Sequence, residues 1–279
     1  DAAASCVASA LLRGARGNSG VILSLLFRGI SKRLKGTETA GSVEFAAALS
    51  DGVSAAYKAV MKPAEGTILT VSRLSAAAAV EAANVGATLE GMLECAIRAG
   101  DEALEDTVNL NPVLKKAGVV DAGGMGFMTI LKAMLASLRG EVVAPAGPVQ
   151  HKAQVEEKTA FEVFDTEDIT FAFDTVYIVR KNDPDVDLEP LRAYLNSIGD
   201  SLVIGEDDES FKVHVHTNIP GDALNESQKY GTLELAKIEN MRTQHDDILA
   251  GKKAQSTDDL EQIEAELEAA ESGEETIAA

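Results

Sequence analysis

The sequence predicts a multidomain protein, with an all-helical bundle or barrel over residues 1–140 and a smaller, ferredoxin-like α/β domain over residues 171–245. Three observations lead to this prediction. In the first part, apolar residues recur at the spacing of one helix face. In the second part, short segments alternate between apolar and polar residues, which is typical of strands. Residues 141–170 between them are rich in charge and contain two prolines, which indicates a linker.

Six helices are expected in the first part, separated by segments that contain glycine or proline, the residues that most often break helices. They cover residues 2–13, 19–35, 43–60, 67–84, 88–107 and 124–139. No segment of this part has the pattern of a strand. The first part is therefore expected to be built from helices alone.

Four strands and two helices are expected in the second part. The strands cover residues 175–180, 201–205, 210–217 and 232–238, and the helices cover residues 188–198 and 220–230. The resulting order, β-α-β-β-α-β, is that of a ferredoxin-like split βαβ unit. Residues 246–279 are strongly acidic and are expected to form a linker or a solvated helix.

The charge of the chain is unevenly distributed. The net charge is −20, yet residues 1–140 carry 14 Lys+Arg and 13 Asp+Glu, a net charge of +1. A nearly neutral domain can hold a polyanion such as ATP, whereas the acidic remainder argues against nucleic-acid binding. Neither a transmembrane segment nor a signal peptide is expected. Cys6 and Cys95 lie in apolar helical patterns, so we expect buried, reduced thiols and a cytoplasmic protein.

Three glycine-bearing segments precede expected helices, whose free N–H groups and dipole attract anions. The first, RGARGNSG, contains Arg16, Asn18 and Ser19 as further donors. A plain helix–helix turn capped by Ser19 would explain the same residues. No Gly-Lys-Ser/Thr follows, so the segment is not a Walker loop.

The second segment, PAEGT, ends on Thr67, which would also serve simply as a helix N-cap. The third, VDAGGMG over residues 120–126, does not follow a strand and lacks the G-x-G-x-x-G spacing, which excludes a Rossmann site. In an up-and-down bundle, the three segments would gather at one end. They would then form a phosphate site built from helix N-termini.

Five motifs in the same order give the chain a family resemblance. They are GARGNSGVILS, KPAEGTILTVS, NPVLKKAGVVDAGGMGF, KVHVHTNIPGDAL and KIENMRTQH. With this set the chain resembles the dihydroxyacetone-kinase-like family, and within it the ATP-binding subunits of bacterial fatty acid kinases. The resemblance covers residues from about 5 to about 245.

The resemblance implies a helical barrel that holds ATP and Mg²⁺ in its mouth. The γ-phosphate would pass to the carboxylate of a fatty acid held on a separate, DegV-like carrier protein. The acyl-chain preference and the oligomeric state stay open, including a homodimer. The positions expected around the nucleotide are Asn18, Ser19, Gly20, Thr67, Asp121, Ala122, Gly123 and Gly124.

The resemblance also implies an aspartate cluster, D-G-D-T-G-x-N, that would chelate two Mg²⁺ ions ahead of the helix with which this sequence opens. That motif does not occur here, and Asp1 already lies inside a helical pattern. We therefore expect that the natural chain is longer at both ends, with a third domain beyond the acidic segment. We also expect that residues 1–279 alone do not catalyse phosphoryl transfer.

Two histidines form a second candidate site, for a metal ion. His214 and His216 are two residues apart on an expected strand and therefore share one face. Two surface histidines without a metal would fit the same pattern. In the resembling proteins a cysteine in the first strand of this domain joins the two histidines at a zinc-like site, and Asp174 stands at that position here. A carboxylate ligates metals but has a different metal preference from a thiolate, so zinc remains open.

Two other functions remain open. One is a dihydroxyacetone kinase, although the plain dihydroxyacetone subunit ends after the helical barrel and lacks the α/β domain. The other is a non-catalytic adaptor that senses nucleotide and docks a partner through its acidic part.

Overall fold

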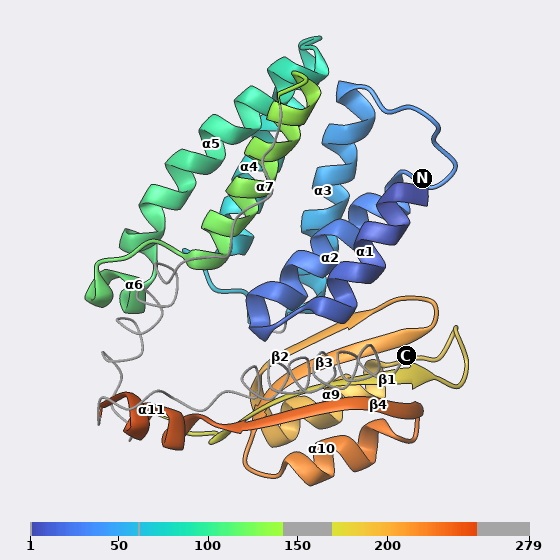
Figure 1. Ribbon diagram of the computed structural model, residues 1–279, viewed down its shortest axis with the longest axis vertical. Coiled ribbons are helices and arrows are strands. Elements are labelled where there is room, and N and C mark those ends of the chain that lie inside the picture. Colours follow the sequence, from blue (N-terminus) through green and yellow to red (C-terminus); the bar gives the residue numbers. More distant parts are fainter. Residues whose placement is uncertain (1, 61, 142–168, 250–279) are drawn as a thin grey trace, which may run out of the picture.

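The computed structural model describes residues 2–60, 62–141 and 169–249. The first part is a bundle of helices (Figure 1). Their bounds are α1 (Ala2–Gly14), α2 (Gly17–Arg33), α3 (Ser42–Ala59), α4 (Ile68–Asn84), α5 (Leu89–Leu110), α6 (Pro112–Ala117) and α7 (Ala122–Leu138). All six helices expected from the periodicity are present.

Helix α6 was not expected, because six residues are too few to show a helical period. Its local signals are nevertheless complete. The Asn111 side chain accepts a hydrogen bond from the Val113 amide, and Pro112 occupies the first turn. Gly118, with a φ of 69°, ends the helix in the left-handed conformation that glycine favours.

The second part is a four-stranded antiparallel sheet with helices between its strands. Its elements are β1 (Phe173–Lys181), α9 (Glu189–Ile198), β2 (Gly199–Glu206), β3 (Ser210–Thr217), α10 (Pro220–Ser227), β4 (Gly231–Asn240) and α11 (Met241–Leu249). The strand order is β2-β3-β1-β4, and each neighbouring pair is antiparallel. The expected split βαβ arrangement is therefore confirmed, and α11 extends it.

The sheet buries both of its faces, which is why β3 is buried at nearly every position. Phe211, Val213 and Val215 pack with α9 and α10 into one core. The intervening residues, among them Lys212 and His214, point to the opposite face, where the helical bundle lies (Figure 1). Alternation along one strand thus separates an apolar core from a polar layer beneath the bundle.

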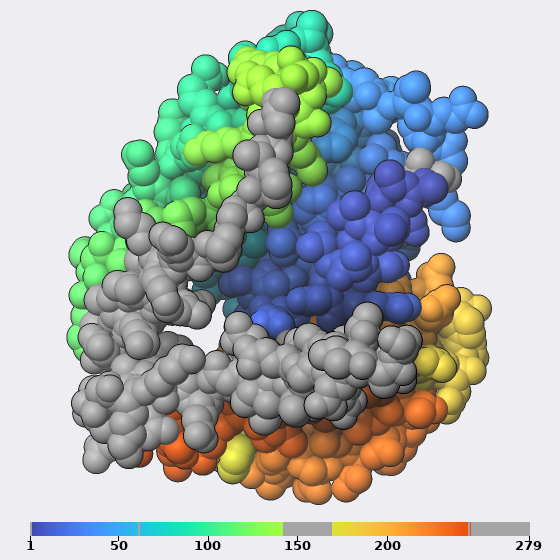
Figure 2. All heavy atoms as spheres, in the orientation of Figure 1, coloured from blue at the N-terminus to red at the C-terminus, as the bar shows by residue number. Residues whose placement is uncertain are grey.

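The two parts share a continuous interface. Val203 of β2 is 2% exposed and belongs to the apolar core of the bundle. It also forms an isolated antiparallel bridge with Val60, just after α3. A Cβ on Gly205 would lie 2.9 Å from Leu12, so glycine allows this close approach of strand and helix. The space-filling view shows the α1–α2 hairpin, in blue, resting on the α/β part (Figure 2).

The expectation of buried cysteines is wrong. Cys6 is exposed and Cys95 is half-buried. Helix α1 buries only Ala8 and Leu12 among the described residues, so Cys6 falls on its open side. The expected linker at residues 141–170 and the acidic segment at 246–279 lie almost wholly outside the described residues. No described helix has the length and apolar character that crossing a membrane requires.

Candidate functional site

The start of α2 presents backbone donors without partners in the helix. The first helical bond runs from the Gly20 amide to the Arg16 carbonyl, at 3.2 Å, so the amides of Gly17, Asn18 and Ser19 precede it. No side chain caps this end, which contradicts the alternative in which Ser19 is a plain cap. Within the described residues, the buried Oδ1 of Asn18 also has no hydrogen-bond partner.

The start of α7 is organised by Asp121. Its carboxylate caps the helix, accepting from the Gly124 amide at 2.6 Å, and also bonds to the backbone of Ile68. Its own amide donates to the Thr107 hydroxyl of α5 at 3.1 Å. Burial raises the pKa of Asp121, and the two bonds to its carboxylate oppose that rise.

The start of α4 is capped by Thr67, whose hydroxyl accepts from the Leu69 amide at 3.3 Å. The preceding loop is held by Thr70, which accepts from the Gly66 amide and donates to Glu65. That bond from Thr70 is the largest cause lowering the pKa of Glu65. Gly66 has a φ of 75°, and a Cβ there would lie 2.9 Å from the Asn111 amide nitrogen.

These three helix starts meet. A Cβ on Gly123 would lie 2.7 Å from the Ser19 hydroxyl oxygen, so α2 and α7 touch at this point. The Asp121 carboxylate reaches Ile68, the residue after Thr67. In Figure 1 the α1–α2 turn and the start of α7 lie at the end of the bundle nearest the sheet. The structure therefore brings the three glycine-bearing segments together, while the nucleotide itself remains a prediction.

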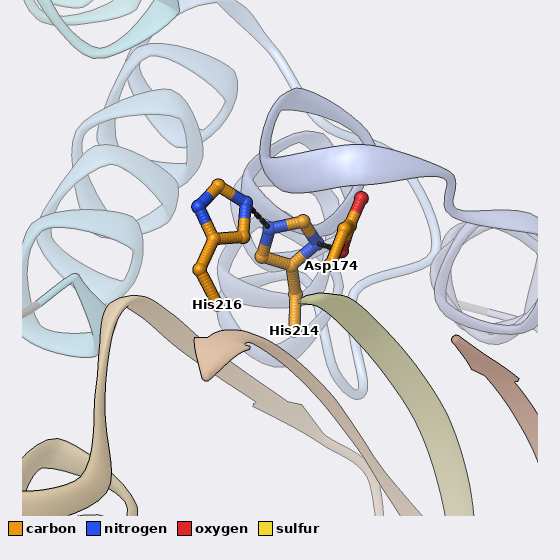
Figure 3. Close-up of side chains that lie close together, drawn as sticks. All are labelled: Asp174, His214 and His216. Atoms are coloured by element: carbon orange, nitrogen blue, oxygen red, sulfur yellow. Dashed lines mark hydrogen bonds and ion pairs between the residues drawn. The ribbon is translucent and has the colours of Figure 1, made fainter. Parts of the chain in front are cut away.

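The second site joins β1 and β3. Asp174, His214 and His216 each offer a ligand atom, and these atoms all lie within 4.8 Å of one another. His214 is central, with its Nδ1 3.5 Å from Asp174 Oδ1 and its Nε2 3.2 Å from His216 Nε2 (Figure 3). On the outer side, His216 Nδ1 lies 3.5 Å from Asp200 Oδ1. A chain of carboxylate, two imidazoles and carboxylate results.

Burial shapes the electrostatics of this second site. His214 is 2% exposed, so the alternative of two surface histidines is wrong for it. Burial lowers the pKa of His214 to about 3, helped by the nearby His216 and Lys212, which leaves a neutral imidazole able to ligate a metal. Burial also raises the pKa of Asp174. Asp174 Oδ1 and His214 Nδ1 are buried without a hydrogen-bond partner among the described residues.

These residues fit a metal ion. Zinc with bonds of about 2.0–2.1 Å places tetrahedral ligands roughly 3.3 Å apart, close to the 3.2 and 3.5 Å separations found here. If the two Nδ1 atoms carry protons toward Asp174 and Asp200, both Nε2 atoms face each other with lone pairs. A cation between them removes that repulsion. The two carboxylates would then orient the rings, as partners of metal-bound histidines commonly do.

Comparisons with known proteins match both parts of the chain. Residues 1–136 match the DAK2 domain, and residues 170–248 match the FakA-like middle domain of fatty acid kinases. The two matches follow one another in the order expected from the motifs. The chain belongs to the FakA-like fatty acid kinase family.

Staphylococcal relatives match along nearly the whole chain. An uncharacterized protein of Staphylococcus saprophyticus is 43% identical over 95% of this chain and 49% of its own length. Uncharacterized proteins of Staphylococcus epidermidis and Staphylococcus aureus are 44% and 42% identical, over 86% and 92% of this chain. The chain spans about half the length of these relatives, 44% and 48% for the latter two.

Sequence reasoning about this FakA-like chain missed Lys212. Its side chain lies on the same face of β3 as the two histidines and is buried. It donates to the carbonyl oxygens of Arg13 and Ala15, in the turn before α2. Burial lowers the pKa of Lys212 to about 8, with Arg16 adding to the effect. The strict alternation along β3 was the signal that could have grouped Lys212 with the histidines.

Proposed function

We propose that this chain is the nucleotide-binding part of a fatty acid kinase. In this proposal the γ-phosphate of ATP passes to the carboxylate of a fatty acid held on a carrier protein. The observation that carries the proposal is the meeting of three helix starts at Ser19 and Gly123. Helix starts stabilise phosphates through free amides and the positive end of the dipole.

The chain's own residues would bind and orient the phosphates. The amides of Gly17, Asn18 and Ser19 supply donors, and the unpartnered Asn18 side chain supplies a further polar group. Gly123 has no Cβ, so the phosphate can approach the backbone beside Ser19. Because phosphoryl transfer depends mainly on positioning and charge stabilisation, the proposal requires no covalent nucleophile.

Magnesium bridges and neutralises the phosphate charges in such reactions and needs several oxygen ligands. The glycine-bearing segments offer only Asp121 and Glu65. Asp121 caps α7, and Glu65 is bonded to Thr70 and Arg73. In the part of the chain that the structure describes, the only group of three potential metal ligands is the one around His214. The described residues therefore do not fit the expected pair of Mg²⁺ ions.

Binding of ATP tests the proposal directly, by isothermal titration with Mg²⁺ present. Gly123→Ala should weaken binding at least tenfold, because the new methyl group would press on Ser19. Gly126→Ala is the matched control, since a Cβ on Gly126, in the same helix, meets nothing within 4 Å. No binding by the wild-type chain, or equal losses in both variants, would sink the proposal.

A kinase assay tests the expected lack of turnover. Residues 1–279 and a full-length relative would be given ATP, Mg²⁺, a fatty acid and its carrier protein. We expect acyl phosphate only from the longer protein, because the described residues lack the Mg²⁺ ligands. Turnover by this chain at a similar rate would show that the active site has been misplaced. A dihydroxyacetone kinase would phosphorylate dihydroxyacetone without the carrier, and an adaptor would bind ATP without turnover in either form.

We also propose that the α/β domain binds a divalent metal ion through His214 and His216, with Asp174 as a ligand or an orienting carboxylate. The facing Nε2 atoms and the buried, unpartnered Asp174 Oδ1 favour this second function. The site lies beneath the helical bundle, so the ion would have a structural role at the junction of the two parts.

A further inference from the structure

One buried lysine connects the α/β domain to the turn that opens α2. Lys212 of β3 is 3% exposed. Its ammonium group donates to the Arg13 carbonyl at 3.1 Å and to the Ala15 carbonyl. No carboxylate among the described residues is paired with it. The charge of Lys212 is therefore compensated by backbone carbonyls of the helical bundle.

This arrangement is costly, since removing an ammonium group from water carries a penalty of several kcal/mol. A methionine would fill the same space without that penalty. The carbonyls of Arg13 and Ala15 lie at the end of α1, where carbonyls have no helical partner and the dipole favours a cation. Lys212 thus fixes the backbone on both sides of Gly14.

The fixed segment leads directly into the candidate phosphate site. Gly17 follows with a φ of 58° and begins α2, whose first three amides have no helical partner. We propose that Lys212 is a positioning residue for the nucleotide site, holding the α1–α2 turn so that these amides face a phosphate. The inference rests on the proposed nucleotide binding and extends it to the role of the α/β domain.

A second contact supports the same role for this domain. Arg192 of α9 donates to the Ala59 carbonyl at 3.0 Å, and Val203 of β2 bridges to Val60. Both contacts hold the end of α3, from which the chain continues to Thr67. The α/β domain therefore contacts two of the three segments that enter the candidate site.

The test compares three variants with the wild-type chain. Lys212→Met removes the ammonium group, and Lys212→Arg restores a cation with donors. Lys181→Met is the matched control, because the Lys181 side chain is also 3% exposed but pairs with Glu206 at 2.6 Å, away from the turn. Hydrogen exchange without nucleotide would follow the Gly20 amide and those after it, and titration would measure ATP affinity with Mg²⁺.

We expect Lys212→Met to speed exchange at the start of α2 and to weaken ATP binding at least tenfold. Lys212→Arg should recover most of both, and Lys181→Met should change neither. Unchanged exchange in Lys212→Met, or the same effect in Lys181→Met, would overturn the inference. If the wild-type chain binds no ATP, the proposed function fails, and the exchange result still decides the role of Lys212 in the turn.

Discussion

At the residue scale, Asp121 shows how one side chain serves structure at the candidate site. Its carboxylate caps α7 through the Gly124 amide and links that helix to the start of α4 through Ile68. The same carboxylate is buried, and burial raises its pKa above the usual 3.8. The cap therefore stabilises the fold, while the buried charge opposes it.

Substitutions of Asp121 should separate these two effects. Asp121→Ala loses the cap and should cost about 1 kcal/mol. Asp121→Asn keeps an acceptor but carries no charge. Because the folded-state pKa is raised, the wild-type carboxyl group stabilises the fold most at low pH, and this contribution is lost as the pH rises through the folded pKa. Relative to wild type, Asp121→Asn should therefore be more stable at pH 7 than at pH 4.

Urea unfolding at the two pH values measures this difference. Titration of other groups, such as His214, is common to both proteins and cancels in the comparison. A constant difference between Asp121→Asn and wild type, or one that shrinks toward pH 7, would contradict the prediction.

His214 and His216 should determine the metal content of the chain. We expect about one divalent ion per chain in protein purified without a histidine tag and saturated with zinc. His214→Ala and His216→Ala should each lose it, whereas Asp222→Asn, an exposed acid in the same domain, should retain it. Elemental analysis by mass spectrometry gives the stoichiometry. A metal-free wild type, or full occupancy in His214→Ala, would exclude the site.

The residue at position 174 should set the metal preference. Asp174→Cys replaces an oxygen ligand with a thiolate, which favours zinc over magnesium or manganese. Competition between these ions, followed by elemental analysis, should show a stronger preference for zinc in the variant. If the preference does not change, Asp174 does not contact the metal and serves only to orient His214.

At the element scale, helix caps separate stability from binding. Thr67 caps α4 at the candidate site, and Thr88 caps α5 away from it, accepting from the Gly91 amide at 3.1 Å. Each Thr→Ala substitution should cost about 1 kcal/mol of folding stability. Only Thr67→Ala should also weaken ATP binding, because only that helix start adjoins Asp121.

Chemical unfolding and ATP titration on the two cap variants provide the readouts. Equal losses of ATP affinity would show that binding follows global stability. No loss in Thr67→Ala would remove α4 from the nucleotide site and leave only the starts of α2 and α7.

At the scale of the whole molecule, the shared interface should make the two parts unfold together. Val203 lies in the core of the bundle although it belongs to the sheet, while Val213 packs on the opposite side with α9 and α10. Val→Ala at either position should cost roughly 1–3 kcal/mol. Val203→Ala should raise hydrogen exchange in α2 and α3 as well as in the sheet, whereas Val213→Ala should affect mainly the α/β domain.

Hydrogen exchange by mass spectrometry on both variants checks this difference. The same pattern in both would mean that the interface does not couple the parts. In that case, the role proposed for Lys212 would also lose its structural basis.

The sequence by itself determined the elements and their order, because helical and strand periods are local properties of the chain. It also showed that His214 and His216 share a face, and it located the glycine-bearing segments. It did not show α6, which is too short to reveal a period. It also left Ser19 as either a cap or a phosphate ligand, and only the structure shows that α2 has no side-chain cap.

Only the tertiary structure decided which strand face the bundle covers. That choice buries His214, lowers its pKa, and turns Lys212 toward the carbonyls before α2. The contact between Ser19 and Gly123 likewise joins residues about a hundred positions apart. The physical reason is that periodicity records which residues share a face, whereas burial and charge compensation depend on what packs against that face.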